Sequence, residues 1–305
     1  MTDVSKLSDT DFARLNLLVL YAEDMCDADM KPASDALDPR IAADGWTVAG
    51  IITGSDFARQ NSPHNPSRYS LTTGGPVRFG YLAYNDNDPS QYVAAIRGTS
   101  GFWEWVDNID FVSVKSAPFP GRVEQGFVEI FQSMQLRPLG SNQSAPLADA
   151  IKNGIVANGQ VLVLGHSLGS TLATFLSFEL ADTACLGADR TAAIMYASPK
   201  VGDGDFTAGY AGRLSNYLVI NYQRDIVPKV PPFDIFHLDI YRTLPNCRIL
   251  TIGKTGRVTI TDTIGCNHHL IDYAAMLDSN VYIQARSAPG WAKSDDSDAQ
   301  CIQSV

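Results

Sequence analysis

The chain has 305 residues, of which 45% are hydrophobic and 18% charged, with a formal net charge of −10. Because an acidic surface repels phosphate groups, this charge argues against nucleic acid as a partner. The apolar runs reach only about six residues, whereas a membrane-spanning helix needs roughly 20, so we expect no transmembrane segment. The first residues lack the cationic start and apolar core of a signal peptide, and we expect either a trimmed secreted form or a cytoplasmic protein.

Hydrophobic periodicity predicts a helix over residues 8–28 and a loop over 29–45 at the start of the chain. In chain order we then predict strands at 46–53, 77–84 and 92–97, helices at 126–137 and 146–158, a strand at 160–165, a helix at 168–182, a strand at 192–198, a helix at 204–214, a strand at 217–223, β-like runs at 247–253 and 257–263, and a helix at 268–277. Strands that alternate with helices in this way are typical of a mostly parallel sheet with helices on both faces. We therefore predict an α/β fold, with one domain over 1–288 and an acidic C-terminal tail over 289–305.

The cysteines lie far apart in the chain and show no zinc-binding spacing. They are Cys26, Cys185, Cys247, Cys266 and Cys301. We expect most of them to be buried thiols. A disulfide between Cys26 and Cys301, near the two ends of the chain, is one pairing that the sequence allows.

A candidate nucleophile lies in the segment QVLVLGHSLGSTLATFLSFELA, which contains a GxSxG motif centred on Ser167. The bare motif is a weak signal, but here it stands between an apolar strand and a helix. A nucleophile elbow requires that context, because the serine occupies a strained strand-to-helix turn in which the flanking glycines avoid side-chain clashes. The alternative is a Gly/Ser turn that only joins strand to helix. We favour Ser167 as the nucleophile.

A serine nucleophile needs a histidine base and an acid that orients it, in the chain order serine, acid, histidine for this type of elbow. The acid candidate is Asp225, which closely follows a predicted strand, although an Asp in a turn is common. Three histidines follow. His237 enters a strand-like segment, where we favour a structural role. His268 and His269 open the final helix, and since neighbouring residues point in different directions, only one of them can be the base.

Five blocks in chain order resemble the class 3 lipase family, the fungal-type triacylglycerol lipases within the α/β-hydrolase fold. They are RGTS at 97–100 with the following Trp105, VEQGF at 123–127, VLGHSLGS at 163–170, ASPKVGDGDF at 197–206 and RDIVPKVPP at 224–232. The resemblance covers roughly residues 45–277. The chain departs from the usual family residues at Asn108, Glu124, Lys200 and Ser170.

The resemblance implies a catalytic triad of Ser167, Asp225 and His268. His268 is preferred as the base because HHLIDY fits a His-x-Leu-x-x-Tyr pattern of many relatives, and His269 is the alternative. The α/β-hydrolase fold with a short lid is implied as well.

The resemblance also implies an oxyanion hole formed by the backbone N–H groups of Thr99 and Leu168. Removing one such donor typically costs about 2.7–4 kcal/mol of transition-state stabilisation. Phe102 and Trp103 fall where lipases of this family carry a lid, and we expect them to contact the acyl chain. For Trp105 we favour a place in the core.

The function implied is a serine carboxylester hydrolase, a lipase that acts on acylglycerol esters at an oil–water interface through an acyl-enzyme. Such a mechanism needs no metal and no organic cofactor. A phospholipase A1, or a feruloyl or short-chain esterase with the same triad, is the alternative. An inactive hydrolase-fold binding protein is a remote one, since every catalytic element is present. Acyl chain length, oligomeric state and compartment stay open.

Overall fold

The computed structural model describes residues 2–27, 31–55, 76–98, 112–155, 158–231, 241–251, 258–291 and 300–304 of the chain. Within these ranges a nine-stranded sheet runs through the molecule. Its strands, in spatial order, are β11 (Cys247–Leu250), β10 (Tyr217–Tyr222), β9 (Thr191–Tyr196), β8 (Gln160–His166), β3 (Gln91–Ile96), β2 (Val77–Asn85), β1 (Trp46–Gly54), β6 (Gln135–Pro138) and β7 (Ala145–Pro146).

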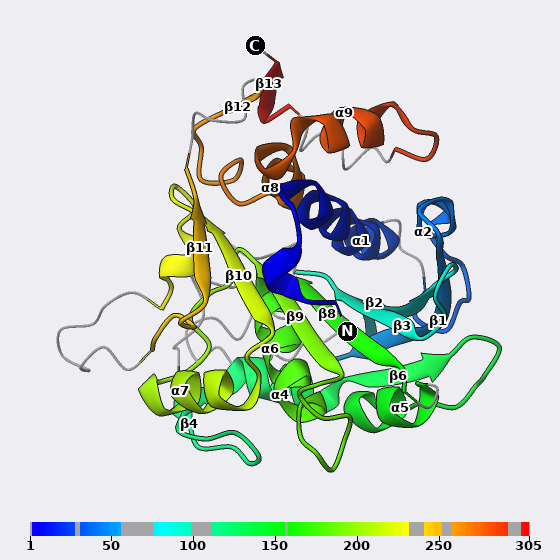
Figure 1. The fold of residues 1–305 in the computed structure, drawn as a ribbon, viewed down its shortest axis with the longest axis vertical. Helices are drawn as coiled ribbons and strands as arrows, with labels where there is room; N and C mark the ends of the chain where they lie inside the picture. The colour runs from blue at the N-terminus through cyan, green and yellow to red at the C-terminus, as the bar shows by residue number, and fades with distance from the viewer. Residues whose placement is uncertain are drawn as a thin grey trace, which may run out of the picture.

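Helices cover both faces of this sheet (Figure 1). One face carries α1 (Asp9–Asp27), α8 (Leu270–Leu277) and α9 (Ser279–Ser287), and the other carries α4 (Gln125–Ser133), α5 (Leu147–Gly154), α6 (Leu168–Leu180) and α7 (Gly204–Arg213). The predicted α/β architecture, with helices on both faces, is confirmed. α1 packs directly against α8, although the two helices are far apart in the sequence.

The part of the sheet that matters for function is the parallel run from β3 through β8, β9 and β10 to β11. From β3 outward through β2, β1, β6 and β7 the pairing is antiparallel. The carboxyl ends of parallel strands meet at one edge of a sheet, and ligands of such folds bind at that edge. The segments after β3, β8 and β10 are therefore brought together there.

β8 lies in the middle of the sheet and is buried on both faces. Because side chains alternate along a strand, Val161 and Val163 enter the core beneath α4 and α6, whereas Leu162 and Leu164 enter the core beneath α1 and α8. The same alternation places the side chain of His166, the last residue of β8, on the face of α1 and α8. The serine turn that follows is thus held by packed helices on both sides.

Two segments form structure that hydrophobic periodicity did not predict. Within the expected loop over 29–45, α2 (Pro39–Ala43) begins at a Pro in its first turn and is capped by the Asp38 side chain. The helix expected over 126–137 ends at Ser133, and the next residues form β6, which pairs with β1. Pairing satisfies backbone groups that β1 would otherwise expose at its edge, and this outweighs the helical pattern.

The end of the chain is tied to the fold. α9 follows α8 directly and is capped by the Asp278 side chain. β13 (Ile302–Ser304), inside the expected tail, pairs with β12 (Val258–Ile260). A disulfide joins Cys301 to Cys266, so the pairing of Cys301 with Cys26 is wrong. The remaining short elements are η1 (Val4–Lys6), β4 (Ser113–Val114), β5 (Val123–Glu124) and η3 (Val227–Lys229).

Candidate active site

Ser167 lies in a sharp turn between β8 and α6, with φ of 55° and ψ of −126°. A positive φ is strained for a residue with a side chain, and such strain is typical of functional turns. The flanking glycines make the turn possible: a Cβ on Gly165 would lie 2.2 Å from the Gly169 carbonyl oxygen, and a Cβ on Gly169 would lie 2.3 Å from that of Ile96. The Ser167 N–H donates to the Tyr196 carbonyl at 3.0 Å. The sequence GxSxG therefore has a steric reason at each glycine.

Ser167, His268 and Asp225 form a continuous chain of hydrogen bonds. The Ser167 Oγ lies 2.9 Å from His268 Nε2, and His268 Nδ1 lies 2.9 Å from Asp225 Oδ2. All three residues are buried, with exposed fractions of 1%, 7% and 0% for Ser167, His268 and Asp225. Because the carboxylate accepts the Nδ1–H, the Nε2 lone pair is left to accept the serine hydroxyl proton. This arrangement can deprotonate the serine as it attacks an electrophile.

The Asp225 carboxylate is held by two further donors. The Val227 N–H donates to Oδ1 at 2.9 Å, and the Tyr273 hydroxyl donates to Oδ2 at 2.7 Å. The Tyr273 oxygen in turn accepts the N–H of Tyr222, at the end of β10, at 2.9 Å. Tyr273 is the tyrosine of the HHLIDY segment, but sequence reasoning gave it no role of its own. It fixes the acid from α8 while β10 delivers the acid from the sheet.

The protonation of His268 suits a base. Burial lowers the pKa of His268, and this effect outweighs the nearby Asp225 carboxylate, which acts to raise it. The imidazole is therefore neutral at neutral pH and can accept a proton. It becomes charged only as the pH falls through a value below the usual 6.5.

The segment after β3 runs close to the nucleophile. A Cβ on Gly98 would lie 3.1 Å from the Ser167 Cβ, so a side chain at this position would require its neighbours to shift by a few tenths of an ångström. The buried Arg97 side chain fixes the segment, since its Nε donates to the Arg78 carbonyl at 2.7 Å. Leu168 is the first residue of α6, and the first N–H groups of a helix have no acceptor within the helix. The site thus presents a helix N-terminus beside the serine.

The structure brings three of the predicted site residues together, Ser167, Asp225 and His268, and places Leu168 beside them. His269 is the N-cap residue of α8, and its neighbour His268 makes the contacts to the serine and the acid. Six further residues singled out from the sequence lie outside the described residues: Thr99, Phe102, Trp103, Trp105, Asn108 and His237.

Two residues without a predicted role lie directly behind His268. The His166 ring packs on the His268 ring, with centroids 4.8 Å apart and planes 30° apart. Glu23, from α1, lies 3.0 Å from His166 Nδ1. The local sequence does not indicate a role for either residue. A glutamate near the end of an amphipathic helix, such as Glu23, is ordinarily a surface residue.

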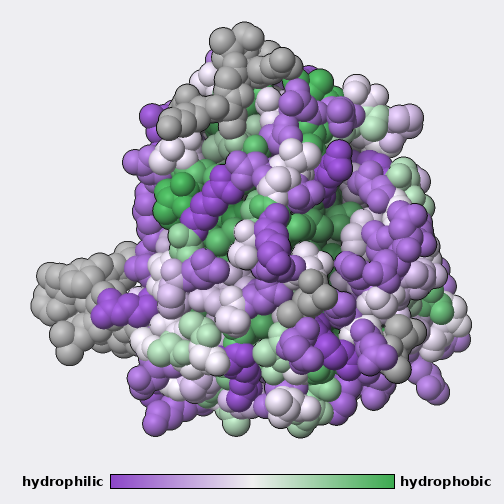
Figure 2. Space-filling view, in the orientation of Figure 1, coloured by the Kyte–Doolittle hydropathy of each residue, from purple (hydrophilic) through white to green (hydrophobic). Residues whose placement is uncertain are grey.

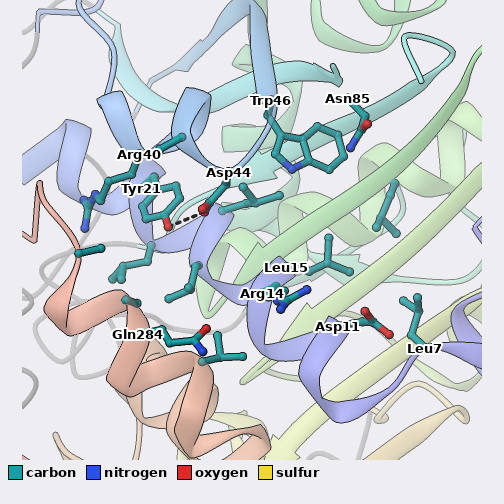
Figure 3. Close-up of a pocket in the computed structure, with 18 of the residues that line it drawn as sticks. Leu7, Asp11, Arg14, Leu15, Tyr21, Arg40, Asp44, Trp46, Asn85 and Gln284 are labelled. Atoms are coloured by element: carbon teal, nitrogen blue, oxygen red, sulfur yellow. Dashed lines mark hydrogen bonds between the residues drawn. The ribbon is translucent and has the colours of Figure 1, made fainter. Parts of the chain in front are cut away.

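A cavity of about 780 Å³ lies elsewhere, beside α1, and the triad residues do not line it. Figure 2 shows apolar side chains gathered around α1 on the face viewed in Figure 1. Leu7, Arg14 and Trp46 line this cavity, and Tyr21 donates a hydrogen bond to Asp44 at 2.7 Å (Figure 3). Because it does not reach Ser167, we do not assign the reacting substrate to this cavity.

Two features are absent from the described ranges. No group of three or more His, Cys, Asp or Glu side chains in them could hold a metal ion. Among the helices in these ranges, none combines the length and the apolar character needed to cross a membrane.

Known proteins resemble this chain in sequence and in fold. The sequence profile of the class 3 lipase family matches residues 93–235, which include Ser167 and Asp225. Phospholipase A1-II 7 of Oryza sativa subsp. indica is 27% identical over 206 residues, 58% of this chain and 50% of that protein. The secreted mono- and diacylglycerol lipase A of Penicillium cyclopium is 26% identical over 220 residues, 69% of this chain and 68% of the relative.

The chain spans about half the length of the first of these relatives. Among solved structures, a triacylglycerol lipase whose catalytic centre is a serine protease triad aligns with a TM-score of 0.52 at 21% identity, covering 74% of this chain and 76% of that one. The matched profile, the lipase relatives and the similar fold agree with one another. The chain resembles the class 3 lipase family over residues 93–235 and has the α/β-hydrolase fold.

Proposed function

We propose that this protein is a serine carboxylester hydrolase, a lipase that cleaves acylglycerol esters through an acyl-enzyme. The observation that carries the proposal is the buried hydrogen-bonded chain from Ser167 through His268 to Asp225. A strained serine with a neutral, oriented imidazole at hydrogen-bond distance is the arrangement that acyl transfer requires. The relatives named as lipases support the acylglycerol substrate.

In the first half-reaction, the Ser167 Oγ attacks the ester carbonyl carbon while His268 Nε2 takes the hydroxyl proton. Asp225 stabilises the imidazolium that forms. The developing oxyanion is held by the backbone N–H groups of Leu168 and Thr99. When the tetrahedral intermediate collapses, the alcohol leaves with the proton from His268, and the acyl group stays on Ser167.

In the second half-reaction, His268 takes a proton from a water molecule as the water attacks the acyl-enzyme carbonyl. Collapse of the second tetrahedral intermediate releases the carboxylic acid, and the proton returns from His268 to the Ser167 oxygen. Each step uses groups of the chain and water alone.

The test is hydrolysis of a p-nitrophenyl ester by the wild type and by Ser167→Ala. We expect the variant to lose hydrolysis while circular dichroism and thermal unfolding stay those of the wild type. His64→Ala, a histidine that precedes the serine in the chain, is the control and should keep the wild-type rate. Activity retained by Ser167→Ala would refute the assignment.

A second candidate is a phospholipase A1, which is favoured by the rice relative named as such. The same triad serves both reactions, so the bond cleaved decides between them. Triacylglycerol emulsions and phosphatidylcholine vesicles labelled at the sn-1 acyl chain, offered at equal ester concentration, separate the two. We expect a higher kcat/KM on the acylglycerol, and the reverse order would select the phospholipase. A feruloyl or short-chain esterase would prefer soluble esters to both.

For Phe102 and Trp103 we propose a role in covering the site and contacting lipid, on the strength of their position in the family pattern. Exchanging both for Ser should lower the rate on emulsified triglyceride several-fold more than the rate on a soluble ester. Equal losses on both substrates would assign these aromatics to the core instead.

We also propose that the protein works in an oxidising compartment, as a secreted enzyme does. The Cys266–Cys301 disulfide supports this, because disulfides persist outside the reducing cytosol. Intact mass measured after alkylation, with and without prior reduction, tests it on protein from its native source. Thiols at both positions in that protein would contradict the proposal.

A further inference from the structure

Behind the catalytic histidine, His166 is held between two hydrogen-bond acceptors. Its Nδ1 lies 3.0 Å from Glu23 Oε1, and its Nε2 lies 2.9 Å from the backbone carbonyl oxygen of His268. The His166 side chain is 6% exposed and that of Glu23 is 23% exposed. Glu23 Oε1 also accepts a longer bond, 3.4 Å, from the N–H of Gly98. One carboxylate and one ring thus contact both the base and the segment that precedes Thr99.

The contacts of His166 define its protonation. A carbonyl oxygen can only accept a hydrogen bond, so Nε2 must carry a proton. A carboxylate also accepts, so Nδ1 must carry a proton as well, and the ring is then an imidazolium. A neutral ring with its proton on Nε2 would instead point the Nδ1 lone pair at the carboxylate. The geometry therefore corresponds to an ion pair between a buried His166 and a partly exposed Glu23.

The electrostatic surroundings favour the same form. Burial alone would lower the pKa of His166, but the charge of Glu23 and its hydrogen bond outweigh burial and raise it. Burial alone would raise the pKa of Glu23, and His166 reverses that effect and lowers it. The other titratable groups that face the pair are Arg97 after β3, Asp225 after β10, His268 and His269 before α8, and Tyr273 on α8.

The pair lies where it can set the position of three catalytic segments. His166 directly precedes Ser167, its Nε2–H holds the main chain of His268, and Glu23 reaches the main chain of Gly98. The stacked rings share a face, so His166 also limits how far the His268 ring can tilt. Because Glu23 and His166 together are neutral, the pair adds little repulsion when His268 takes up its proton.

We propose that Glu23 and His166 are positioning residues, a charged pair that holds the His268 main chain and the Gly98 segment in register with Ser167. The inference rests on the proposed function, since it assigns the pair to the ester hydrolysis described above. The two packed histidines differ in charge. His268 is neutral and acts as the base, and His166 is positively charged and supports it.

Because of this pair, we expect activity to fall as the pH rises through the pKa of His166. A histidine whose pKa is raised on folding keeps its stabilising contact below about 6.5, and loses it as the pH rises through the folded value. His268 behaves in the opposite way, because it must be neutral to act. The most active protonation state therefore exists between the lowered pKa of His268 and the raised pKa of His166.

The experiment compares Glu23→Leu, Glu23→Gln and a control with the wild type. The control is Asp9→Asn, a carboxylate-to-amide change on the same helix that removes an exposed ion pair with Arg248. For each protein, kcat and KM for p-nitrophenyl butyrate and the rate of fluorophosphonate labelling are measured from about pH 5 to about pH 10. Circular dichroism establishes that each variant is folded.

We expect Glu23→Leu to lower kcat about tenfold or more with little change in KM, because the base and the oxyanion segment lose their support. In Glu23→Gln, an amide N–H can donate to a neutral His166 that keeps its Nε2–H on the His268 carbonyl. This variant should recover most of the lost rate and shift or abolish the alkaline limb. Asp9→Asn should follow the wild type at every pH.

The inference is overturned if Glu23→Leu follows Asp9→Asn across the pH range, or if Glu23→Gln keeps the wild-type alkaline limb. Labelling separates this failure from failure of the proposed function. If the wild type reacts with the probe and the variants match it, only the positioning pair is refuted. If the wild type does not react at all, the ester hydrolase fails and the pair loses its role with it.

A measurement without variants tests the charge state directly. Nitrogen chemical shifts of ¹⁵N-histidine-labelled wild type at about pH 7 should show both ring nitrogens of one buried histidine protonated. The peaks are assigned to His166 by their absence in His166→Phe. A lone-pair shift for either His166 nitrogen would overturn the inference, even if every Glu23 variant failed to fold.

Discussion

Hydrogen bonds to both oxygens fix the orientation of the Asp225 carboxylate. Of its two oxygens, one accepts from the Val227 main chain and the other from both His268 and Tyr273. The residue is fully buried, so a lost donor cannot be replaced by bulk water. The orientation of His268 therefore depends on Tyr273, a fully buried residue of α8.

Tyr273→Phe should lower kcat on a soluble ester about tenfold and reduce the free energy of unfolding by about 1–3 kcal/mol. The kinetic loss follows because Asp225 can rotate away from His268, and the stability loss because the Tyr222 N–H is left without its acceptor. Steady-state kinetics and urea unfolding measure the two effects. Tyr282→Phe, which removes a hydroxyl bonded to Arg286 on α9, is the matched control. Equal effects of both changes would show that Asp225 does not need Tyr273.

The acid limb of kcat/KM for a soluble ester should have its midpoint below pH 6.5. The sign follows from His268: only the neutral ring accepts the serine proton, and burial lowers its pKa, so protonation inactivates the enzyme at a pH below the usual histidine value. Ser167→Ala measured at each pH corrects for spontaneous hydrolysis. A midpoint above 6.5 would mean that Asp225 dominates over burial.

Chain order and a strand-turn-helix context selected Ser167 and Asp225 as candidates, and the family resemblance selected His268 over His269. The structure places these three side chains in one hydrogen-bonded chain. The sequence was not sufficient for Glu23, His166 and Tyr273 as supporting residues. Their roles arise from contacts over large sequence separations, and nothing local in α1 or α8 indicates which polar side chain faces the site.

In the elbow between β8 and α6, the close contact of main-chain segments requires glycine at two positions. Gly165 and Gly169 bring the start of α6 against the ends of β3 and β8, and the neighbouring atoms are main-chain oxygens that cannot move aside cheaply. A side chain at either glycine would therefore have to displace main-chain atoms next to Ser167.

Gly169→Ala should destabilise the protein by about 3 kcal/mol, because its Cβ would lie 2.3 Å from the Ile96 oxygen and 2.4 Å from the Arg97 oxygen. Gly204→Ala, at the start of α7, is the control, since nothing lies within 4 Å of its Cβ. Urea unfolding of both variants measures the difference. If the two variants unfold at the same urea concentration, the close packing at the elbow does not constrain the fold.

Prediction of the elements succeeded where one pattern was long and uninterrupted, as in α1, β8 and α6. It failed where a short segment was decided by its neighbours. β6 follows a helical pattern but pairs with the edge of β1, and α2 depends on the capping of a five-residue turn by Asp38. α9 begins directly after α8, and the sequence pattern predicted no helix there.

Across the whole molecule, the last part of the chain closes on the segment that carries the base. Cys301 is bonded to Cys266, two residues before His268, and β13 pairs with β12. The acidic and polar composition of this region predicted a loose tail. Composition could not indicate the ordered end, because it does not reveal a partner for the final cysteine. The long-range pairing anchors the loop from which His268 reaches the triad.

Reduction of this disulfide should lower the free energy of unfolding by roughly 3–4 kcal/mol, since it removes a crosslink between residues 35 positions apart. Urea unfolding of the wild type with and without a reducing agent measures the loss. The double variant Cys266→Ser with Cys301→Ser should match the reduced wild type and should not respond to the reducing agent. An oxidised wild type no more stable than the double variant would refute this role.

The central claim is that Ser167 is a nucleophile activated by His268. The most direct measurement is fluorophosphonate labelling of the native protein, with the modified residue located by peptide mass spectrometry. We expect a single adduct on Ser167 and no adduct in Ser167→Ala. Labelling of His268→Ala should be slower than that of the wild type by orders of magnitude, whereas His269→Ala should label far faster than His268→Ala. An adduct on another residue, or labelling of His268→Ala at the wild-type rate, would contradict it.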